Sequence, residues 1–454
     1  MKKIMFILSS VLALASCGGT ASVKSTYSVT FKNYDLSVLY ETEVQPGGEA
    51  FYEGETPLKP STDNKISYIF SGWDKQLVNI QEDCSRIAQF REEYNYTKGL
   101  SFEYSEAFDS YLVKSYIGSS TEILIPQQYA GKPVYAIAQG VFYNSSITSI
   151  ELPESLLEIG NACFQSSRLV SIDIPEGVTK IGEYMFANCP SFISATFPST
   201  LKTFAWASAF LESPNVESIS ISADNAYFQI IDNVAYSKDG KTLLYCPSNI
   251  DASSLLIPNE VTSIGAGAFH SNRKLSSIVF PSSLSSIGGN AFYGCSALTS
   301  IDLPSNLSSI NQNPFAECIH LSSITVDVTN ASFKAVDNVI FNKSDTSLIC
   351  YPAGKTSENY VIPNSIVTLS ARAFEGSRYL EYVIIPASVT TIGNNCFASC
   401  SNALIFFEST TLPSSLGSYW NYPAIPYYLY SENQPSQTNV YWHYVEGNPT
   451  IWAL

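Results

Sequence analysis

The chain repeats a short apolar pattern at a fixed spacing of 23 residues. The segment VTSIGAGAFHSNRKLSSIVFP, residues 261–281, is followed by LSSIGGNAFYGCSALTSIDLP, residues 284–304. Between the two copies Phe269 returns as Phe292. A period between about 20 and 50 residues indicates stacked units, because one unit alone cannot bury its apolar face. The pattern therefore predicts a solenoid, and not a globular domain.

Two series of residues carry the repeat along most of the chain. A stretch of the type IDIP ends at Pro126, Pro153, Pro175, Pro198, Pro258, Pro281, Pro304, Pro363 and Pro386. A corner phenylalanine recurs at Phe142, Phe164, Phe186, Phe210, Phe269, Phe292, Phe315, Phe374 and Phe397. Two more stretches, VESISIS and LSSITVD, lack the proline, and ALIFFES ends the series, so we expect about twelve coils.

Each coil is expected to contain one short strand that ends at the repeated proline. In LSSIVF, residues 275–280, polar residues separate the apolar ones, which is typical of a strand with one buried face. Leu275 and Ile278 would point inward, and the proline would end the strand because it has no N–H to donate. Gly288 suits the bend that follows, and the corner phenylalanines would stack in one column through the core.

Two longer intervals in the repeat contain a second repeated motif. NAYFQIIDNVAYSKDGKTLLYCPSN begins at Asn225, and NASFKAVDNVIFNKSDTSLICYPAG begins at Asn330, 105 residues later. Each copy predicts a strand, a turn and a second strand, and Asp239-Gly240 favours a tight turn in the first copy. We therefore expect hairpin insertions in two enlarged coils. Duplication of a whole block of coils is their simplest origin.

The segment VTSIGAGAFHSNRKLSSIVFPSSLSSIGGNAFYGC closely resembles the BspA-type leucine-rich repeat found on bacterial surface proteins. Residues 117–142 are similar to the opening coil of that family, and residues 427–452 are similar to its closing segment. The resemblance implies a mainly β chain with a right-handed leucine-rich-repeat solenoid over residues 100–412. It also implies a role in adhesion or recognition at the cell surface.

The N-terminal segment MKKIMFILSSVLALASC has two lysines, a short apolar stretch and small residues before Cys17. The run from Leu14 to Cys17 resembles the lipobox of bacterial lipoproteins, which implies a signal peptide over residues 1–16 and a lipid on Cys17. Residues 17–26 would form a polar tether. We therefore expect a chain anchored in the cell envelope through this lipid only and exposed outside the cytoplasm. An ordinary cleaved signal with an incidental cysteine is the alternative.

Residues 27–93 follow a different pattern from the solenoid. The motifs VTF, PGG, FSGWDK and AQF resemble the internalin B-repeat, also called the Listeria–Bacteroides repeat, although the middle loop diverges. The resemblance implies one small β-grasp-like module that acts as a stalk or spacer, sometimes with adhesive function.

The composition disfavours nucleic acid as a partner. Only 14% of the residues are charged, the net charge is −16, and the sequence contains no basic stripe that could neutralise phosphates. The three histidines, His270, His320 and His443, have no spacing that indicates a metal pair or a nucleophile with its base. We therefore expect no catalytic residues, no metal and no cofactor.

The cysteines follow the repeat and are interpreted as small buried residues. One group falls three residues after a corner phenylalanine: Cys189, Cys295, Cys318 and Cys400. Recurrence at one repeat position is typical of packing in the core. Cys295 and Cys318 would lie on neighbouring coils, so they are the best candidates for a disulfide in an exported protein.

Aromatic residues crowd into residues 413–454, which we expect to form a C-terminal cap. A terminal coil must have its apolar end covered, and large side chains can do so. An open platform on which sugar rings stack is the alternative. Two functions follow: a non-catalytic recognition or adhesion lipoprotein with a protein, matrix or glycan partner, and a carbohydrate-binding or envelope-structural lipoprotein.

Overall fold

The computed structural model describes residues 24–437 and 440–452, so Cys17 lies outside the described residues. The chain divides into two compact units, with the boundary between Asn95 and Tyr96. The polypeptide is mainly β, as expected, and its single described helix, α1 (Trp206–Ala209), is one turn long. The described residues include no helix that is long and apolar enough to cross a membrane.

The first unit contains one mixed sheet of four strands. Its strands are β1 (Tyr27–Lys32), β2 (Val38–Val44), β3 (Ile66–Trp73) and β4 (Cys84–Tyr94). Their order is β2-β1-β4-β3, the central pair is parallel, and both edge strands pair antiparallel to it. Phe31 is fully buried, and its ring lies 4.7 Å from that of Trp73.

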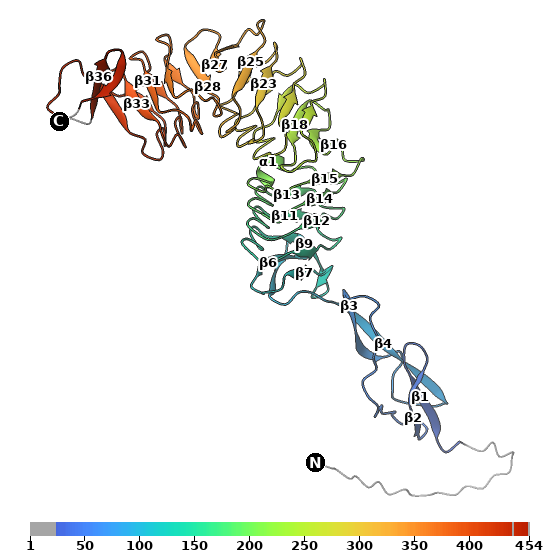
Figure 1. Cartoon of the computed structure of the whole chain (residues 1–454). Helices are drawn as coiled ribbons and strands as arrows, with labels where there is room; N and C mark the ends of the chain where they lie inside the picture. Colours follow the sequence, from blue (N-terminus) through green and yellow to red (C-terminus); the bar gives the residue numbers. More distant parts are fainter. Residues whose placement is uncertain (1–23, 438–439, 453–454) are drawn as a thin grey trace, which may run out of the picture. The chain divides into compact units, whose positions relative to one another are not determined.

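The second unit is a solenoid whose coils each contribute a strand that we call a proline strand, after the repeated proline (Figure 1). The proline strands are β7 (Glu122–Leu124), β10 (Ser149–Glu151), β12 (Ser171–Asp173), β14 (Ser194–Phe197), β15 (Ser218–Ile221), β19 (Ser254–Leu256), β21 (Ser277–Val279), β23 (Ser300–Leu303), β25 (Ser323–Val326), β29 (Asn359–Val361), β31 (Tyr382–Ile385), β33 (Leu404–Phe407), β35 (Tyr427–Tyr430) and β36 (Tyr441–Val445). Neighbouring proline strands that pair do so in parallel, in the register of the repeat.

The solenoid has about fourteen turns, two more than the motif count. The additional strands are β35 and β36, which extend the sheet in parallel from β33. They lie in the segment that we expected to form only a cap. The repeat motif did not predict these two strands, because YYLY and YWHYV contain neither the repeated proline nor the corner phenylalanine.

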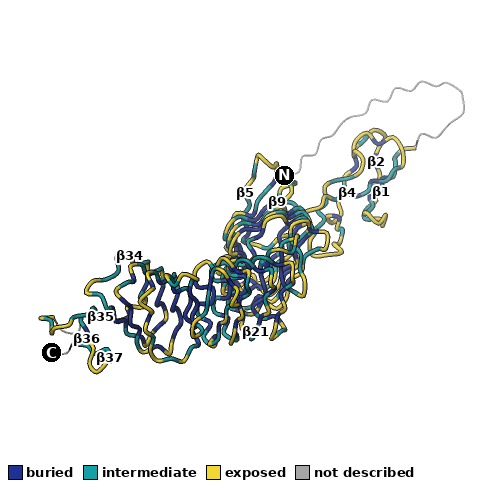
Figure 2. Tube along the Cα trace, turned by 90° about the horizontal axis from the view of Figure 1, so that it is seen from above, coloured by how far each residue is buried: buried dark blue, intermediate teal, exposed yellow. Residues whose placement is uncertain are grey.

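A second strand in most coils leads into the corner, and we call it the corner strand. The corner strands are β9 (Lys132–Ile137), β11 (Glu158–Ile159), β13 (Lys180–Ile181), β18 (Thr242–Tyr245), β20 (Ser263–Ile264), β22 (Ser286–Ile287), β24 (Ser309–Ile310), β28 (Ser347–Cys350), β30 (Thr368–Leu369), β32 (Thr391–Ile392) and β34 (Ser415–Leu416). Residues between the two strand rows are buried, and the outer surfaces of the coils are exposed (Figure 2).

The first coil is covered by a hairpin that the repeat pattern did not predict. Strands β5 (Leu100–Ser105) and β6 (Ser110–Tyr116) pair antiparallel, β6 runs parallel to β9, and β8 (Gln128–Tyr129) pairs with β9. The ring of Tyr116 lies 5.5 Å from that of Phe142, so this hairpin closes the N-terminal end of the core.

Each regular corner holds its phenylalanine between two residues in the left-handed conformation. Around Phe292 these are Asn290, with φ 56°, and Gly294, with φ 68°. Glycine and asparagine adopt positive φ at low cost, which explains why small or amide residues recur there. The backbone N–H of Phe292 donates to the carbonyl of Pro314 in the next corner, at 2.9 Å. Corners are thus hydrogen-bonded to one another along the solenoid.

The cysteines at the repeat position extend this corner network. The thiols of Cys189, Cys295, Cys318 and Cys400 each donate to the carbonyl of a phenylalanine in the preceding corner, at 2.9–3.1 Å. The nine described cysteines are all free thiols, including the candidate pair Cys295 and Cys318. Burial raises the pKa of the Cys295 thiol well above its usual range, so it stays protonated and able to donate.

Each hairpin insertion has three strands, where the sequence predicted two. They are β16 (Phe228–Ile231), β17 (Val234–Ser237) and β18 in the first insertion, and β26 (Phe333–Val336), β27 (Val339–Asn342) and β28 in the second. The chain turns at Asp239-Gly240 as predicted. It also turns at Asp232-Asn233, where both residues have positive φ, 47° and 65°. A two-residue turn of this kind matches the twist of a hairpin.

The inserted strands divide the core into three compartments. On β17, Ala235 faces the N-terminal cluster, whereas its neighbours Val234 and Tyr236 face the middle cluster. On β27, Ile340 faces the middle cluster, and Val339 faces the C-terminal one. These strands are therefore buried on both sides, as the all-buried run VAY shows.

The single column of phenylalanines expected from the sequence is consequently three shorter stacks. All nine corner phenylalanines are buried. The first stack ends with Phe210 against Tyr245, with ring centroids 4.6 Å apart, and the third begins with Tyr351 against Phe374, at 5.2 Å. In the middle stack Phe292 lies between Phe269 and Phe315, at 4.8 and 5.3 Å.

The aromatic end of the chain covers the last coils. Trp420 is 9% exposed and packs against Phe397 and Phe407 of the inner core. Trp442 is fully buried on the opposite face of the sheet, where it contacts Phe406 and donates its indole N–H to the carbonyl of Phe407 at 2.8 Å. The short strand β37 (Asn448–Ile451) pairs antiparallel with β36 and ends the sheet.

Replacing Phe292 by alanine should destabilise the solenoid by about 3–5 kcal/mol, because it removes a buried ring that contacts rings on both sides. The measurement is the free energy of unfolding in urea. Val279→Ala, at a position that is 53% exposed, is the control and should change stability by less than about 1 kcal/mol. Equal effects of the two changes would contradict the stacked core.

Candidate functional site

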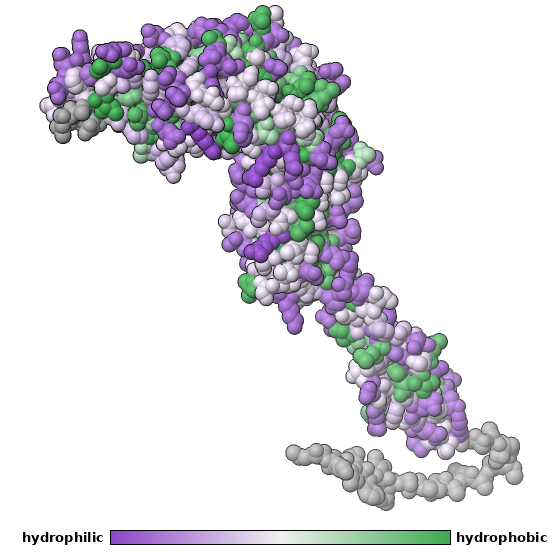
Figure 3. Space-filling model, in the orientation of Figure 1, coloured by the Kyte–Doolittle hydropathy of each residue, from purple (hydrophilic) through white to green (hydrophobic). Residues whose placement is uncertain are grey.

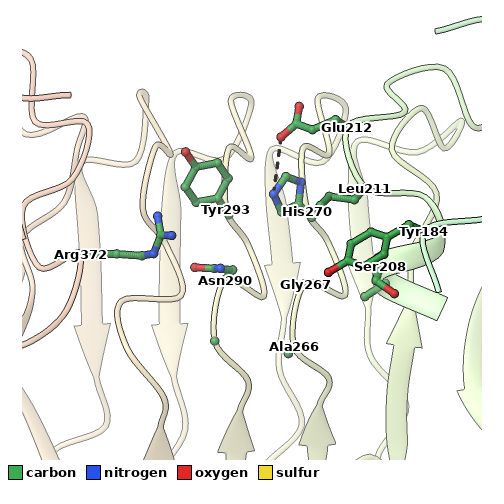
Figure 4. A pocket seen from close by; sticks show the side chains of 12 residues that line it. Tyr184, Ser208, Leu211, Glu212, Ala266, Gly267, His270, Asn290, Tyr293 and Arg372 are labelled. Carbon is green, nitrogen blue, oxygen red and sulfur yellow. Dashed lines mark ion pairs between the residues drawn. The ribbon is translucent and has the colours of Figure 1, made fainter. Parts of the chain in front are cut away.

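An open hollow of about 540 Å³ interrupts the row of corners beside the first hairpin insertion (Figure 4). Its walls come from corners on both sides of the insertion, including Glu212 before it and Gly267 and His270 after it. Tyr184 and Arg372 extend into the hollow from opposite ends, and Asn290 lies between them (Figure 4).

The hollow exists because the inserted coil has a shortened corner. Leu243 is followed by ten residues before β19 begins, whereas Ile287 is followed by twelve residues before β23. None of residues 244–253 has a positive φ, so the usual left-handed turn is missing there. Within the part of the chain that the structure describes, no backbone hydrogen bond joins the corner at 206–212 to the corner at 266–270.

The second insertion has an equally short corner, but its neighbours close the gap. The backbone N–H of Asn313 donates to the carbonyl of Ala371 at 3.2 Å, and that of Glu317 donates to Glu375 at 3.4 Å. The side-chain amide of Asn313 also donates to the carbonyl of Arg372 at 2.9 Å. The two corners therefore bond directly to each other.

The two blocks that contain the insertions are 105 residues apart, so each residue of the second block can be compared with its counterpart in the first. This comparison identifies the residues that close the second gap and leave the first open. Asn313 corresponds to Ser208, whose hydroxyl donates back to Ala205 within its own corner at 3.2 Å. The corresponding positions of Arg372 and Glu375 are Gly267 and His270. The first block thus lacks the amide that bridges the gap in the second block.

Long side chains occupy left-handed positions around the hollow. Tyr184, Glu212 and Arg372 have φ values of 57°, 55° and 61°. Most corresponding positions in other corners hold small residues or amides, such as Gly140, Ala162, Ser166, Asn188 and Asn395. Glu317, the counterpart of Glu212 in the second block, is an exception with φ 59°. A positive φ is costly for a bulky residue, and such strain collects at functional sites. The choice of long side chains at these positions therefore favours a role in binding.

A row of polar and aromatic side chains runs along one wall. The ring of His270 stacks on that of Tyr293, with centroids 5.0 Å apart, and His270 Nε2 lies 3.8 Å from Glu212 Oε1. The guanidinium of Arg372 lies 5.5 Å from the centroid of Tyr293, which is held between His270 and Arg372 (Figure 4). Arg372 also pairs with Glu375, at 2.6 Å.

Burial changes the pKa values along this row. It lowers the pKa of His270, although Glu212 acts in the opposite direction, so the imidazole is neutral at pH 7. Burial and the nearby Glu375 carboxylate raise the pKa of Tyr293 to about 12. Burial also raises the pKa of Glu375, against the effect of Arg372. Ser271 Oγ lies 3.0 Å from His270 Nδ1 and orients the ring.

The sequence predicted the buried phenylalanines but not this hollow. It treated His270 as a histidine without a partner, because Glu212 lies 58 residues earlier and approaches only across the shortened corner. His320 contacts the carbonyl of Ser296, and His443 stacks on Trp452. A comparison of positions 105 residues apart would have shown that Gly267 and His270 differ in type from their counterparts in the second block, Arg372 and Glu375.

The described residues include no group of three histidine, cysteine or acidic side chains that could hold a metal. Trp420 and Trp442 are buried, so these two rings do not form the open sugar platform that was the alternative for the aromatic end.

Comparison with known proteins identifies the repeat. The description of the matching family is BspA type leucine rich repeat region, with six copies over residues 115–240, 244–357 and 350–422. The chain belongs to this family of bacterial leucine-rich-repeat proteins. Among the curated proteins, none matches the chain.

Several solved structures are similar to the chain. A leucine-rich repeat protein from Eubacterium ventriosum is 19% identical, covers 72% of this chain and 93% of its own, and has a TM-score of 0.48. A leucine rich cell surface protein from Faecalibacterium prausnitzii is 26% identical, with 70% and 76% coverage and a TM-score of 0.39. The pneumococcal vaccine antigen PcpA is 16% identical, with 80% and 97% coverage and a TM-score of 0.40.

The buried His270 should make the solenoid less stable as the pH falls. Its pKa in the folded chain lies below the value of about 6.5 in an unfolded chain, so the unfolded state binds more protons below that pH. The melting temperature should therefore decline below about pH 6.5, and more steeply for the wild type than for His270→Gln. His320→Gln, at an exposed histidine, should follow the wild type. Parallel pH profiles for the wild type and His270→Gln would show that His270 keeps its ordinary pKa.

Proposed function

We propose that the chain is a non-catalytic recognition protein displayed at the cell surface, with a protein, matrix or glycan as its partner. The observation that carries this proposal is the hollow beside the first hairpin, where the repeat is broken and three long side chains in left-handed positions gather. A rigid scaffold that positions such a site is the usual arrangement for binding.

The outer face of the proline strands is a second surface that a large partner could contact. Its outward positions carry mostly Ser, Thr and Asp, whereas Leu256 and Val279 are neighbours in register and are 73% and 53% exposed. Figure 3 shows polar and apolar residues interspersed over the side of the solenoid that it draws. Such a face suits a protein partner that covers several coils.

The N-terminal part of the chain supports display at the surface. The lipobox-like run that ends at Cys17 would anchor the chain, and residues 17–26 would separate the anchor from the folded units. We infer that the four-stranded unit serves as a spacer of the internalin B-repeat type. Its motifs and its sheet order support this inference.

Cells that carry the full chain should bind to at least one surface in a panel of immobilised matrix proteins and neutral glycans. The Cys17→Ala variant should be released from the membrane, so its cells should lose this binding while the released protein keeps it. The measurements are cell retention on the panel and fractionation of the chain without detergent.

The control is the Cys84→Ala variant, at a half-buried cysteine of the first unit, which should remain at the membrane. Membrane retention of the Cys17→Ala chain would contradict the anchor. Failure of wild-type cells to bind any surface in the panel would contradict the recognition function.

A further inference from the structure

We propose that the hollow beside the first hairpin binds a neutral sugar ring, such as the terminal hexose of a glycan. This inference rests on the proposed recognition function and names the ligand class of its site. The volume of about 540 Å³ lies within the range of small-molecule sites in proteins.

The charges around the hollow favour a neutral ligand. The guanidinium of Arg372 is paired with Glu375 at 2.6 Å, whereas the half-exposed carboxylate of Glu212 faces only the neutral His270. The walls therefore carry an excess of negative charge, as does the chain, with a net charge of −16. This excess disfavours phosphate, sulfate and acidic sugars, and a tri-lysine peptide in the test below covers the cationic alternative.

The polar groups of the walls retain hydrogen-bonding capacity that sugar hydroxyls can use. The nearest partner of the Glu212 carboxylate is His270 Nε2 at 3.8 Å, which is too far for a hydrogen bond. Arg372 uses Nη1 for Glu375, and other N–H groups of its guanidinium remain available. Each sugar hydroxyl can both donate and accept a hydrogen bond. A sugar can therefore donate to the Glu212 carboxylate and accept from the Arg372 guanidinium.

The aromatic groups supply the apolar contact that a sugar ring needs. Tyr184 is 41% exposed, and its ring borders the hollow opposite Arg372 (Figure 4). A pyranose has an apolar face of C–H bonds that can pack on such a ring. Tyr293 is already covered on both sides by His270 and Arg372, so its role is to hold these two side chains in place.

The site is also pre-organised. Tyr184, Glu212, Asn290 and Arg372 all occupy left-handed positions, where the backbone is fixed by the corner hydrogen bonds. A site that is rigid before binding loses less conformational entropy when the ligand binds. Binding would explain why three long side chains with positive φ gather around one hollow.

The test begins with the full chain on an array of neutral mono- and disaccharides that includes glucose, galactose, mannose, N-acetylglucosamine, lactose and maltose. The strongest ligand is then titrated calorimetrically into the wild type and the variants. Tyr184→Ala and Glu212→Gln should each weaken binding by at least about tenfold, because each removes a direct contact in the hollow.

Two matched controls come from left-handed residues elsewhere in the solenoid. Tyr419, with φ 53° and 71% exposure, matches Tyr184, and Glu446, with φ 51°, matches Glu212. Tyr419→Ala and Glu446→Gln should bind the sugar within about twofold of the wild type. Melting temperatures of all four variants show whether a loss of binding comes from unfolding.

The proposal is overturned if no sugar on the array binds, or if folded Tyr184→Ala and Glu212→Gln chains bind the sugar as tightly as the wild type. It is also overturned if a tri-lysine peptide binds in the hollow and the sugars do not. If any of these results is obtained and wild-type cells still bind a matrix protein, the sugar inference fails but the recognition function stands.

Discussion

The hydrogen bond between neighbouring corners is the interaction on which the solenoid depends. A corner phenylalanine such as Phe269 donates its N–H to the carbonyl of Ala291 in the next corner, at 2.7 Å, and its ring stacks on that of Phe292. Neither contact exists within one coil, so a coil is stable only beside its neighbours. In the regular corners, left-handed residues bracket the phenylalanine and direct these N–H groups along the solenoid.

The two hairpin coils are the places where this interaction is interrupted. Phe210 and Phe315 precede the shortened corners, and neither donates its N–H to the next corner within the described residues. The inserted strands β17 and β27 fill the core at those points instead, with residues buried on both sides. Asn313 restores contact between the flanking corners at the second insertion, whereas the first insertion stays open. The candidate site is thus a consequence of one missing bridge in a duplicated block.

The fold could be predicted from the sequence to a considerable extent, because the repeat places a proline and a phenylalanine at fixed positions in each coil. The buried corner phenylalanines and the two insertions follow directly from that spacing, and the turn at Asp239-Gly240 follows from its residue types. Strands β35 and β36 could not be predicted from the spacing. They continue the sheet, but their sequences lack the repeated proline and phenylalanine. The turn at Asp232-Asn233 was missed, although Asp and Asn favour turns and both recur 105 residues later as Asp337 and Asn338.

The hollow could not be predicted in this way, because it depends on contacts between residues far apart in the sequence. Glu212 and His270 meet only because the corner between them is two residues short, and Arg372 reaches Tyr293 across the second insertion. The sequence does contain a signal in Ser208 and Gly267, which differ from Asn313 and Arg372 one block later. That signal has meaning only once the corners are known to bond to each other.

The most direct test of this account is to close the hollow with the residues of the second block. In the double variant Ser208→Asn with Gly267→Arg, the asparagine can bridge the two corners, and the arginine occupies a left-handed position like that of Arg372. Calorimetric titration of this variant with the array's strongest sugar is the decisive measurement. The account predicts a folded chain that binds the sugar at least about tenfold more weakly than the wild type. A variant that keeps its melting temperature and also the wild-type affinity would contradict it.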